Sequence, residues 1–187
     1  MAKQCQSEQT SRRHAAFEQS LLTLLRTQSL QSVSVKDICQ AASIPRRTFY
    51  HYFAGKEELV DALIRDLLLA CDLTVVPSPS DGPDRQRESL LRFFTFWQQE
   101  HRETLELLLR NDQGPQIIRQ AHQWIGREYL HGEDSSQSSN TRQMVALATV
   151  SGLFSLLFFW FQTGCKQSAE EMADHTAHFL SQPLVLW

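Results

Sequence analysis

The stretch SIPRRTFYHYFAGKEEL, residues 43–59, decides how the N-terminal part of this chain folds, because basic and aromatic side chains alternate along it. An α-helix advances about 100° per residue. One face of the helix that follows Pro45 therefore carries Arg46, Arg47, Tyr50 and His51. The opposite face carries Phe49, Tyr52 and Phe53. We expect Phe49 and Phe53, with Ile44, to pack into a core, so that the first face points outward.

A second short helix precedes this one. Ser34 stands before VKDICQAA with Asp37 three residues on, which is close to a capping box and predicts a helix over residues 35–42. Pro45 cannot continue that helix, because the residue before a proline avoids the α region, but it suits the start of the next helix. Two short helices joined by a tight turn, with charges on the second, are typical of a helix-turn-helix whose second helix enters the DNA major groove.

Helical periodicity continues along the rest of the chain. Two segments rich in proline, glycine or small polar residues predict loops over residues 73–84 and 131–140. Further helices are expected over residues 11–28, 56–71, 85–100, 101–110, 115–131 and 141–163, and after a capping box of Ser168 with Glu171. Because no strand pattern or internal repeat is present, the chain is predicted to be all-α, with about nine helices.

Charge is distributed unevenly along the sequence. Residues 1–56 hold eight Lys and Arg against three acids, whereas the whole chain has a net charge of -3. This asymmetry favours a basic module that meets a polyanion, joined to an acidic body that does not. Four scattered cysteines form no CxxC pair, and the N-terminus lacks the apolar segment of a signal peptide. A reduced, cytoplasmic location is expected.

Residues 34–59, SVKDICQAASIPRRTFYHYFAGKEEL, resemble the DNA-binding signature of the TetR family of transcriptional regulators. The matching positions are Ile38, Ala42, Thr48, Tyr50, Phe53, Lys56 and Leu59. The resemblance implies a three-helix helix-turn-helix DNA-binding domain over residues 1–56. It also implies a larger helical domain over residues 57–187 that binds an effector and forms a dimer.

The same resemblance implies which residues meet DNA. Five side chains are expected to face the duplex: Arg46, Arg47, Thr48, Tyr50 and His51. Tyr52 and Lys56 are expected near phosphates, Ser34 is expected to cap the preceding helix close to the DNA backbone, and Lys36 completes the set. Arginine can donate two hydrogen bonds to a guanine edge, and the other side chains fix the backbone. Where the family usually has glycine in the turn, this chain has Ser43, for which a left-handed backbone is less comfortable.

An apolar run over residues 144–161 just reaches the length of a membrane span. Polar and small residues inside it, and the absence of flanking basic clusters, favour a buried soluble helix instead. Ala148, Gly152 and Ser155 form a stripe of small residues that admits another helix, either within one subunit or between two. The resemblance favours the second reading, because such proteins pair their last two helices across a dimer, and Phe179 on the last helix joins this expected interface.

An effector pocket is expected among aromatic residues of the C-terminal part. The candidates are Phe93, Phe96, Trp97, His101, Trp124 and Phe158, with His122 as a polar anchor. Aromatic residues at helical spacing more commonly form a core, so that packing inside the domain is the competing reading. An aromatic cavity would favour an apolar or flat effector.

No catalytic signature is found: GxSxG, a P-loop, a GxGxxG after a strand and HExxH are all missing from the sequence. No enzyme activity, cofactor or metal is therefore expected, and His175 and His178 are read as part of a solvated helix face. The expected function is a DNA-binding transcriptional repressor that binds a palindromic operator as a homodimer and is released by a small-molecule effector. Activation, or a helical interaction or membrane-associated protein without DNA binding, remains the alternative.

Overall fold

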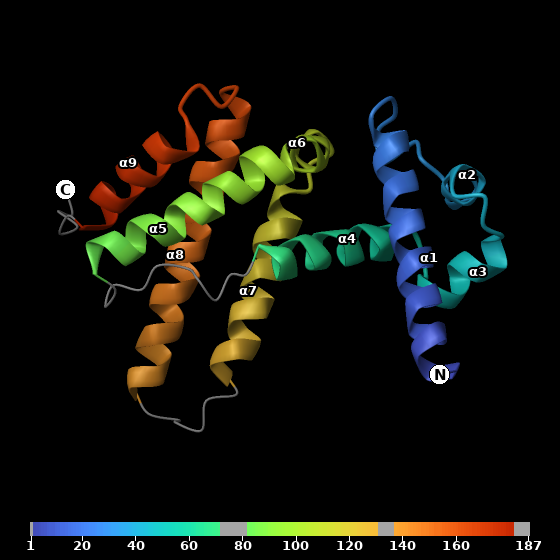
Figure 1. Ribbon diagram of the computed structural model, residues 1–187, viewed down its shortest axis with the longest axis horizontal. Coiled ribbons are helices and arrows are strands. Elements are labelled where there is room, and N and C mark those ends of the chain that lie inside the picture. Colours follow the sequence, from blue (N-terminus) through green and yellow to red (C-terminus); the bar gives the residue numbers. More distant parts are fainter. Residues whose placement is uncertain (1, 72–81, 131–136, 182–187) are drawn as a thin grey trace. The chain divides into compact units, whose positions relative to one another are not determined.

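The computed structural model describes residues 2–71, 82–130 and 137–181 (Figure 1). These residues form nine α-helices and one π-helical segment, and they contain no strand. The predicted all-α class is confirmed. The loop predicted over residues 73–84 falls mostly outside the described residues. The loop predicted over residues 131–140 is wrong at its end, because a helix already begins at Gln137.

The chain divides into two compact units, residues 1–67 and residues 68–187. The first holds α1 (Ala2–Leu25), α2 (Val35–Ala41), α3 (Arg46–Tyr52) and most of α4 (Lys56–Ala70). The division falls inside α4, whereas the domain boundary expected from the sequence lies between residues 56 and 57, at the start of that helix. The helix predicted over residues 11–28 begins earlier and ends earlier than expected.

The core of the N-terminal unit is aromatic. The fully buried rings of Phe17 on α1 and Phe49 on α3 meet edge to face, with their centroids 5.2 Å apart. Phe53 packs on Phe49 at 5.3 Å. Edge-to-face pairs of this kind contribute about 0.5–1.5 kcal/mol beyond their buried area. Ile38 from α2 and Leu59 from α4 are also fully buried, so every helix of the unit anchors at least one side chain in this core.

The C-terminal unit contains α5 (Pro83–Thr95), a π-helical segment η2 (Phe96–Glu100), α6 (Arg102–Arg110), α7 (Gly114–Leu130), α8 (Gln137–Gln162) and α9 (Ala169–Ser181). α5 lies beside α9, and α7 lies beside α8 (Figure 1). Phe94 meets Trp160 edge to face at 5.5 Å, and Phe93 meets Phe154 at 5.6 Å. The predicted capping box at the start of α9 is confirmed, with Ser168 and Glu171 exchanging hydrogen bonds.

Three helices end in the same hydrogen-bonded turn. At the end of α2, Ser43 N donates to Gln40 O and Ile44 N donates to Cys39 O, which is a Schellman motif. α6 and α8 end in the same pattern, with Asp112 and Gly164 in place of Ser43. All three residues have positive φ: 54° at Ser43, 59° at Asp112 and 85° at Gly164. The left-handed backbone that the family obtains from glycine is therefore present here on a serine.

Among the described residues, one helix is long and apolar enough to cross a membrane, and this stretch of α8 covers Gln143–Gln162. Its side chains divide by face. Val150, Leu153, Phe154, Leu157 and Trp160 are buried within the C-terminal unit. Met144, Val145, Leu156 and Phe159 are exposed.

Candidate nucleic-acid interface

α3 presents its two faces as the sequence predicts. Phe49 is fully buried, whereas Tyr50 is 58% exposed and Arg46, Arg47 and His51 are exposed. Thr48 is half-buried at the edge of this outer face. Neither arginine forms an ion pair with any carboxylate in the described part of the chain. The guanidinium groups are thus available to an anionic partner.

The start of α2 is fixed by a complete capping box. Ser34 Oγ accepts from Asp37 N at 3.3 Å, and the Asp37 carboxylate accepts from Ser34 N at 2.9 Å. The hydrogen bond from the Ser34 hydroxyl, helped by the Ser34 backbone N–H, lowers the pKa of Asp37 below its usual range. Asp37 therefore serves as the N3 residue of the capping box, a position that Glu or Gln usually occupies. Ser34 is the N-cap, as predicted, and Lys36 is exposed on the first turn of the same helix.

Lys56 has a role that sequence reasoning missed. Its ammonium group donates to three backbone carbonyls, those of Leu30 at 2.7 Å, Gln31 at 3.1 Å and Val33 at 2.8 Å. An ammonium group has three hydrogens, so these bonds use its full donor capacity. They tie the start of α4 to the α1–α2 loop directly before the Ser34 cap. A phosphate contact by Lys56 would have to replace one of these hydrogen bonds.

Tyr52 links α3 to the N-terminal half of α1. Its ring meets His14 edge to face at 5.2 Å, and its hydroxyl oxygen lies 3.5 Å from Arg13 Nη1. Hydrogen bonding from Arg13, and then from Thr10, lowers the pKa of the Tyr52 phenol. The ring is half-buried, so that Tyr52 sits at the border between the core and the exposed basic surface.

Glu18 is an unusual feature of the same unit. Burial against its surroundings, followed by the nearby Asp66 carboxylate, raises the pKa of Glu18 to about 7, with Arg65 opposing the shift. Its Oε1 atom is buried and has no hydrogen-bond partner among the described residues. Below about pH 7 this carboxyl is therefore mainly protonated, because the charged form loses hydration that the nearby Arg65 charge only partly offsets. The sequence gives no sign of it, since Glu18 stands in an ordinary amphipathic pattern.

The four residues expected at a dimer interface are all exposed in the single chain. Ala148, Gly152 and Ser155 lie on one side of α8, and Phe179 on α9 is 60% exposed. Met144 at 70% and Phe159 at 64% belong to the same exposed face and were missed. Both could have been predicted from spacing, because Met144, Ala148, Gly152, Ser155 and Phe159 lie at i, i+4, i+8, i+11 and i+15 and therefore share one face of α8.

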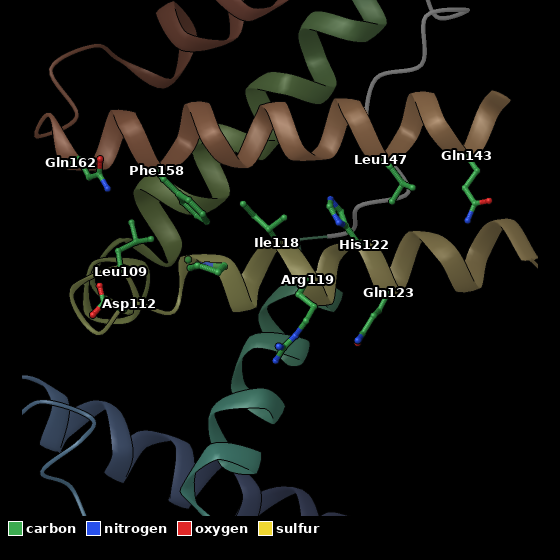
Figure 2. Close-up of a pocket in the computed structure, with 12 residues that line it drawn as sticks. Leu109, Asp112, Ile118, Arg119, His122, Gln123, Gln143, Leu147, Phe158 and Gln162 are labelled. Atoms are coloured by element: carbon green, nitrogen blue, oxygen red, sulfur yellow. The ribbon is translucent and has the colours of Figure 1, made fainter. Parts of the chain in front are cut away.

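The aromatic residues expected in an effector pocket are dispersed. Phe93 and Trp97 are buried and pack on Phe154, and the indole N–H of Trp97 has no acceptor among the described residues. His101 stacks on Phe96 at 4.4 Å, and Trp124 is half-buried on α7. Only His122 and Phe158 line the cavity that the structure contains between α7 and α8, which has a volume of about 880 Å³ (Figure 2).

Comparison with known proteins supports the reading of the N-terminal helices. Residues 21–63 match the family model for bacterial regulatory proteins of the tetR family. The chain is 35% identical over 86 residues to the HTH-type transcriptional regulator EthR of Mycolicibacterium smegmatis, covering 44% of this chain and 40% of EthR. It is 34% identical over 68 residues to the HTH-type transcriptional repressor KstR2 of the same organism, covering 36% and 33%. The matched region thus spans less than half the length of these curated relatives.

Solved structures share the whole fold at low sequence identity. A TetR transcriptional regulator from Streptococcus agalactiae superposes with a TM-score of 0.62 at 18% identity, covering 96% of this chain and 99% of the other. A tetR-family regulator from Streptomyces coelicolor gives 0.56 at 22% identity, covering 91% and 79%. The helix-turn-helix geometry and the family model agree that residues 21–63 form a DNA-binding domain of the tetR family, and the solved structures show that the chain shares their overall fold.

Proposed function

We propose that this chain is a transcriptional regulator that binds a palindromic DNA operator as a homodimer, through the outer face of α3. The proposal rests on the two faces of α3, one buried and aromatic and the other exposed and basic. Phe49 and Phe53 hold the helix against Phe17, and this leaves Arg46 and Arg47 exposed and without an ion pair to any described residue. Exposed arginines on a rigid helix can reach base edges, while Thr48, Tyr50 and His51 beside them can reach the sugar-phosphate backbone.

The Ser34 cap and Lys36 extend this surface to the start of α2. A helix N-terminus favours anions because the helix dipole is positive there, although the Asp37 carboxylate already accepts the Ser34 N–H at the start of α2. Lys36 adds a cation on the first turn. In this proposal Lys56 acts mainly by holding the α1–α2 loop, and Tyr52 acts by holding α1 against α3, so that both position the interface from behind.

The homodimer is supported by the exposed apolar face of α8 and α9. Ala148, Gly152 and Ser155 permit a close approach of another helix, and Phe159 and Phe179 supply apolar area around them. A two-fold dimer would place two α3 helices about one DNA turn, roughly 34 Å, apart and would read two inverted half-sites. The regulator is proposed to act in the cytoplasm, to repress by occupying an operator, and to be released when a small molecule binds its C-terminal unit.

Selection of bound duplexes from a random pool tests DNA binding, palindromy and half-site spacing together. The selected duplex is then used to measure binding by the full-length chain and by the double variant Arg46→Ala, Arg47→Ala over a range of salt concentrations. Each lost phosphate contact lowers the slope of log K against log salt by about 0.9, and each lost bidentate base contact also reduces sequence discrimination. Unchanged binding by this variant would remove α3 as the recognition helix.

A matched control is Arg110→Ala with Lys166→Ala. Both side chains are exposed cations of the C-terminal unit, so this variant changes the net charge equally without touching α3. Its DNA affinity is expected to stay within about twofold, because neither side chain belongs to the N-terminal unit that carries the proposed interface.

A further inference from the structure

The cavity between α7 and α8 is a groove whose two ends differ in chemistry. Leu109, Pro115 and Phe158 line the end next to α6, and Ile118 continues this apolar wall. The polar side chains of Gln162 and Asp112 stand at the margin of the same end. His122, Gln123 and Gln143 line the other end, with Leu147 between the side chains of His122 and Gln143, as Figure 2 shows. Arg119 lies between these ends along α7, at the rim of the groove, and its side chain points away from α8. A molecule with an apolar body and one polar head would match this arrangement, because each part meets a surface of its own kind.

The apolar end is tightly built. Gly114 opens α7 directly below the Phe158 ring, and a Cβ atom placed on Gly114 would come within 3.2 Å of that ring. The absence of a side chain therefore lets Phe158 lie across the start of α7 and form the wall of the groove. Asp112 is the one acidic residue of the lining, and it stands at this end, away from the polar end.

Arg119 is the cation of the lining, and no described carboxylate pairs with it. Its guanidinium donates to the Gln116 side chain, which is a neutral acceptor. A guanidinium has five N–H donors, so most of its capacity stays open. An anionic group beside Arg119 would therefore gain charge-assisted hydrogen bonds without displacing an ion pair.

His122 adds a second polar group, and its hydrogen bonding can be worked out. The Ser151 hydroxyl donates its single hydrogen to Leu147 O at 2.7 Å, so it can only accept from His122 Nε2, which lies 2.7 Å away. His122 Nε2 thus carries a hydrogen. The other ring nitrogen, Nδ1, has no partner within the described residues, which leaves one hydrogen-bonding atom of the imidazole unused near the polar end of the groove.

We propose that this groove binds an amphipathic organic anion, with its carboxylate at Arg119 and the Gln123 side and its apolar body along Ile118 toward Phe158. The proposal rests on the proposed function in one respect, that such a ligand is the effector. α8 supplies Leu147 and Phe158 to the groove and, one residue further on in each case, Ala148 and Phe159 to the exposed apolar face. A ligand in the groove therefore contacts the helix that carries the proposed dimer interface.

The test is calorimetric titration of the full-length chain without DNA, using two matched pairs of probes. Decanoate is compared with decanamide, and naphthalene-2-carboxylate with naphthalene-2-carboxamide, so that each pair keeps one body and changes only the charge of the head. In at least one pair we expect the carboxylate to bind about 10-fold or more tightly, as hydrogen bonds to a charged group would give. Failure of both pairs to bind, or equal binding of acid and amide, would overturn the proposal.

Variants locate the site. Arg119→Gln should reduce the affinity for the carboxylate to that for the amide and leave the amide unchanged, whereas Arg110→Gln, an exposed cation on α6, should change neither. Ile118→Trp and, separately, Leu147→Trp should weaken both members of the pair about 10-fold or more, with the helical circular dichroism of the chain unchanged. A carboxylate preference that survives Arg119→Gln, or binding that survives both tryptophan variants, would place the ligand elsewhere.

A last measurement separates this inference from the proposed function. The anisotropy of the selected duplex is followed while the tighter carboxylate is added. Release of DNA supports the effector role, and binding in the groove without release shows a ligand site that does not regulate. If the chain binds the carboxylate through Arg119 and selects no duplex, the proposed function fails while the site remains.

Discussion

α3 and α8 each leave one face uncovered in the single chain, and the two faces have opposite chemistry. The outer face of α3 carries Arg46, Arg47 and polar rings, whereas that of α8 carries Met144, 70% exposed, and Phe159, 64% exposed. A charged face stays hydrated in the unbound chain, so that it can remain exposed until a transient partner binds. An apolar face in water forgoes about 25 cal/mol for each Å² that could be buried. The first is suited to reversible binding and the second to a permanent contact.

The largest effect is expected when the buried aromatic anchor of α3 is removed. Phe49→Ala deletes a fully buried ring and should lower the free energy of unfolding by about 3–5 kcal/mol, with loss of DNA binding. Tyr50→Ala, one position along and 58% exposed, should change it by less than about 0.5 kcal/mol while still weakening DNA binding. Urea unfolding followed by circular dichroism measures both. Equal losses would show that the two faces of α3 are not distinct.

The α8 face is tested by adding a charge to it. Phe159→Arg places a guanidinium at the C-terminal end of the exposed face of α8 and should weaken self-association by about 2 kcal/mol or more, roughly 30-fold in Kd. Gln99→Arg, an exposed change on η2, adds the same charge outside α8 and α9 and should leave the Kd unchanged. Sedimentation equilibrium measures the Kd. Wild-type chain that is monomeric at micromolar concentration would contradict the permanent contact itself.

Variants of Lys56 and Lys36 distinguish a residue that positions the DNA-binding surface from one that contacts DNA. Lys56→Met keeps the aliphatic stem but removes the bonds to three carbonyls, and should lower stability by about 1.5–3 kcal/mol. Lys36→Met, on the exposed first turn of α2, should leave stability unchanged and lower the salt slope of DNA binding by about 0.9. A Lys56 variant of full stability with a lower salt slope would show that Lys56 binds phosphate instead.

Glu18 predicts a pH dependence that belongs to the N-terminal unit alone. The folded chain keeps this proton up to about pH 7, whereas the unfolded chain releases it near pH 4.5. The unfolded state therefore binds fewer protons between these values, and stability falls as the pH rises through this window. Because the side chain is only half-buried, we expect the fall to be about 1–2 kcal/mol rather than the full linkage value.

Glu18→Gln should remove this slope and raise stability at pH 8, since a neutral amide fills the same space without a charge. Glu57→Gln, an exposed carboxyl on the first turn of α4, is the control and should keep the slope. Unfolding midpoints in urea at pH 5, 6, 7 and 8 decide the matter. A wild-type midpoint that stays constant across this range would show that the Glu18 carboxylate is better solvated than its burial indicates.

The smallest expected effect concerns the turn before α3. Ser43 has a φ of 54°, which a side chain disfavours, so Ser43→Gly should raise stability by about 0.5–1 kcal/mol. Ser43→Ala keeps the Cβ atom and should give no gain. A glycine variant no more stable than the alanine variant would show that the serine is unstrained there.

The sequence predicted the parts of this molecule that depend on local periodicity. The two faces of α3, the Ser34 cap and the all-helical class follow from spacing within a few residues. The family resemblance placed Lys56 near phosphates. Its hydrogen bonds to three carbonyls could not be predicted, because these partners lie more than 20 residues away and only the folded chain brings them to its ammonium group. Residue type alone does not separate a core from a pocket, so Phe93 and Trp97 were expected at an effector site although both pack in the interior.

The residues that line the groove could not be predicted from the sequence either. Arg119 and Ile118 have no distinguishing sequence pattern, and what sets them apart is that both line the groove between α7 and α8. The apolar pattern of α8 predicts burial on most sides, but which of its sides stays open depends on the placement of α5, α7 and α9. Contacts between helices distant in sequence, rather than periodicity within one helix, decide both features.

The Schellman turn that ends α2 recurs at the ends of α6 and α8, with serine, aspartate and glycine respectively at the left-handed position. In each case the same two backbone hydrogen bonds form, so the turn is specified by the main chain and is tolerant of the side chain. A search pattern that demands glycine before α3 would therefore pass over chains such as this one. In this chain the hydrogen bonds from Ser43 N and Ile44 N, rather than the absence of a side chain, mark the turn that leads into α3.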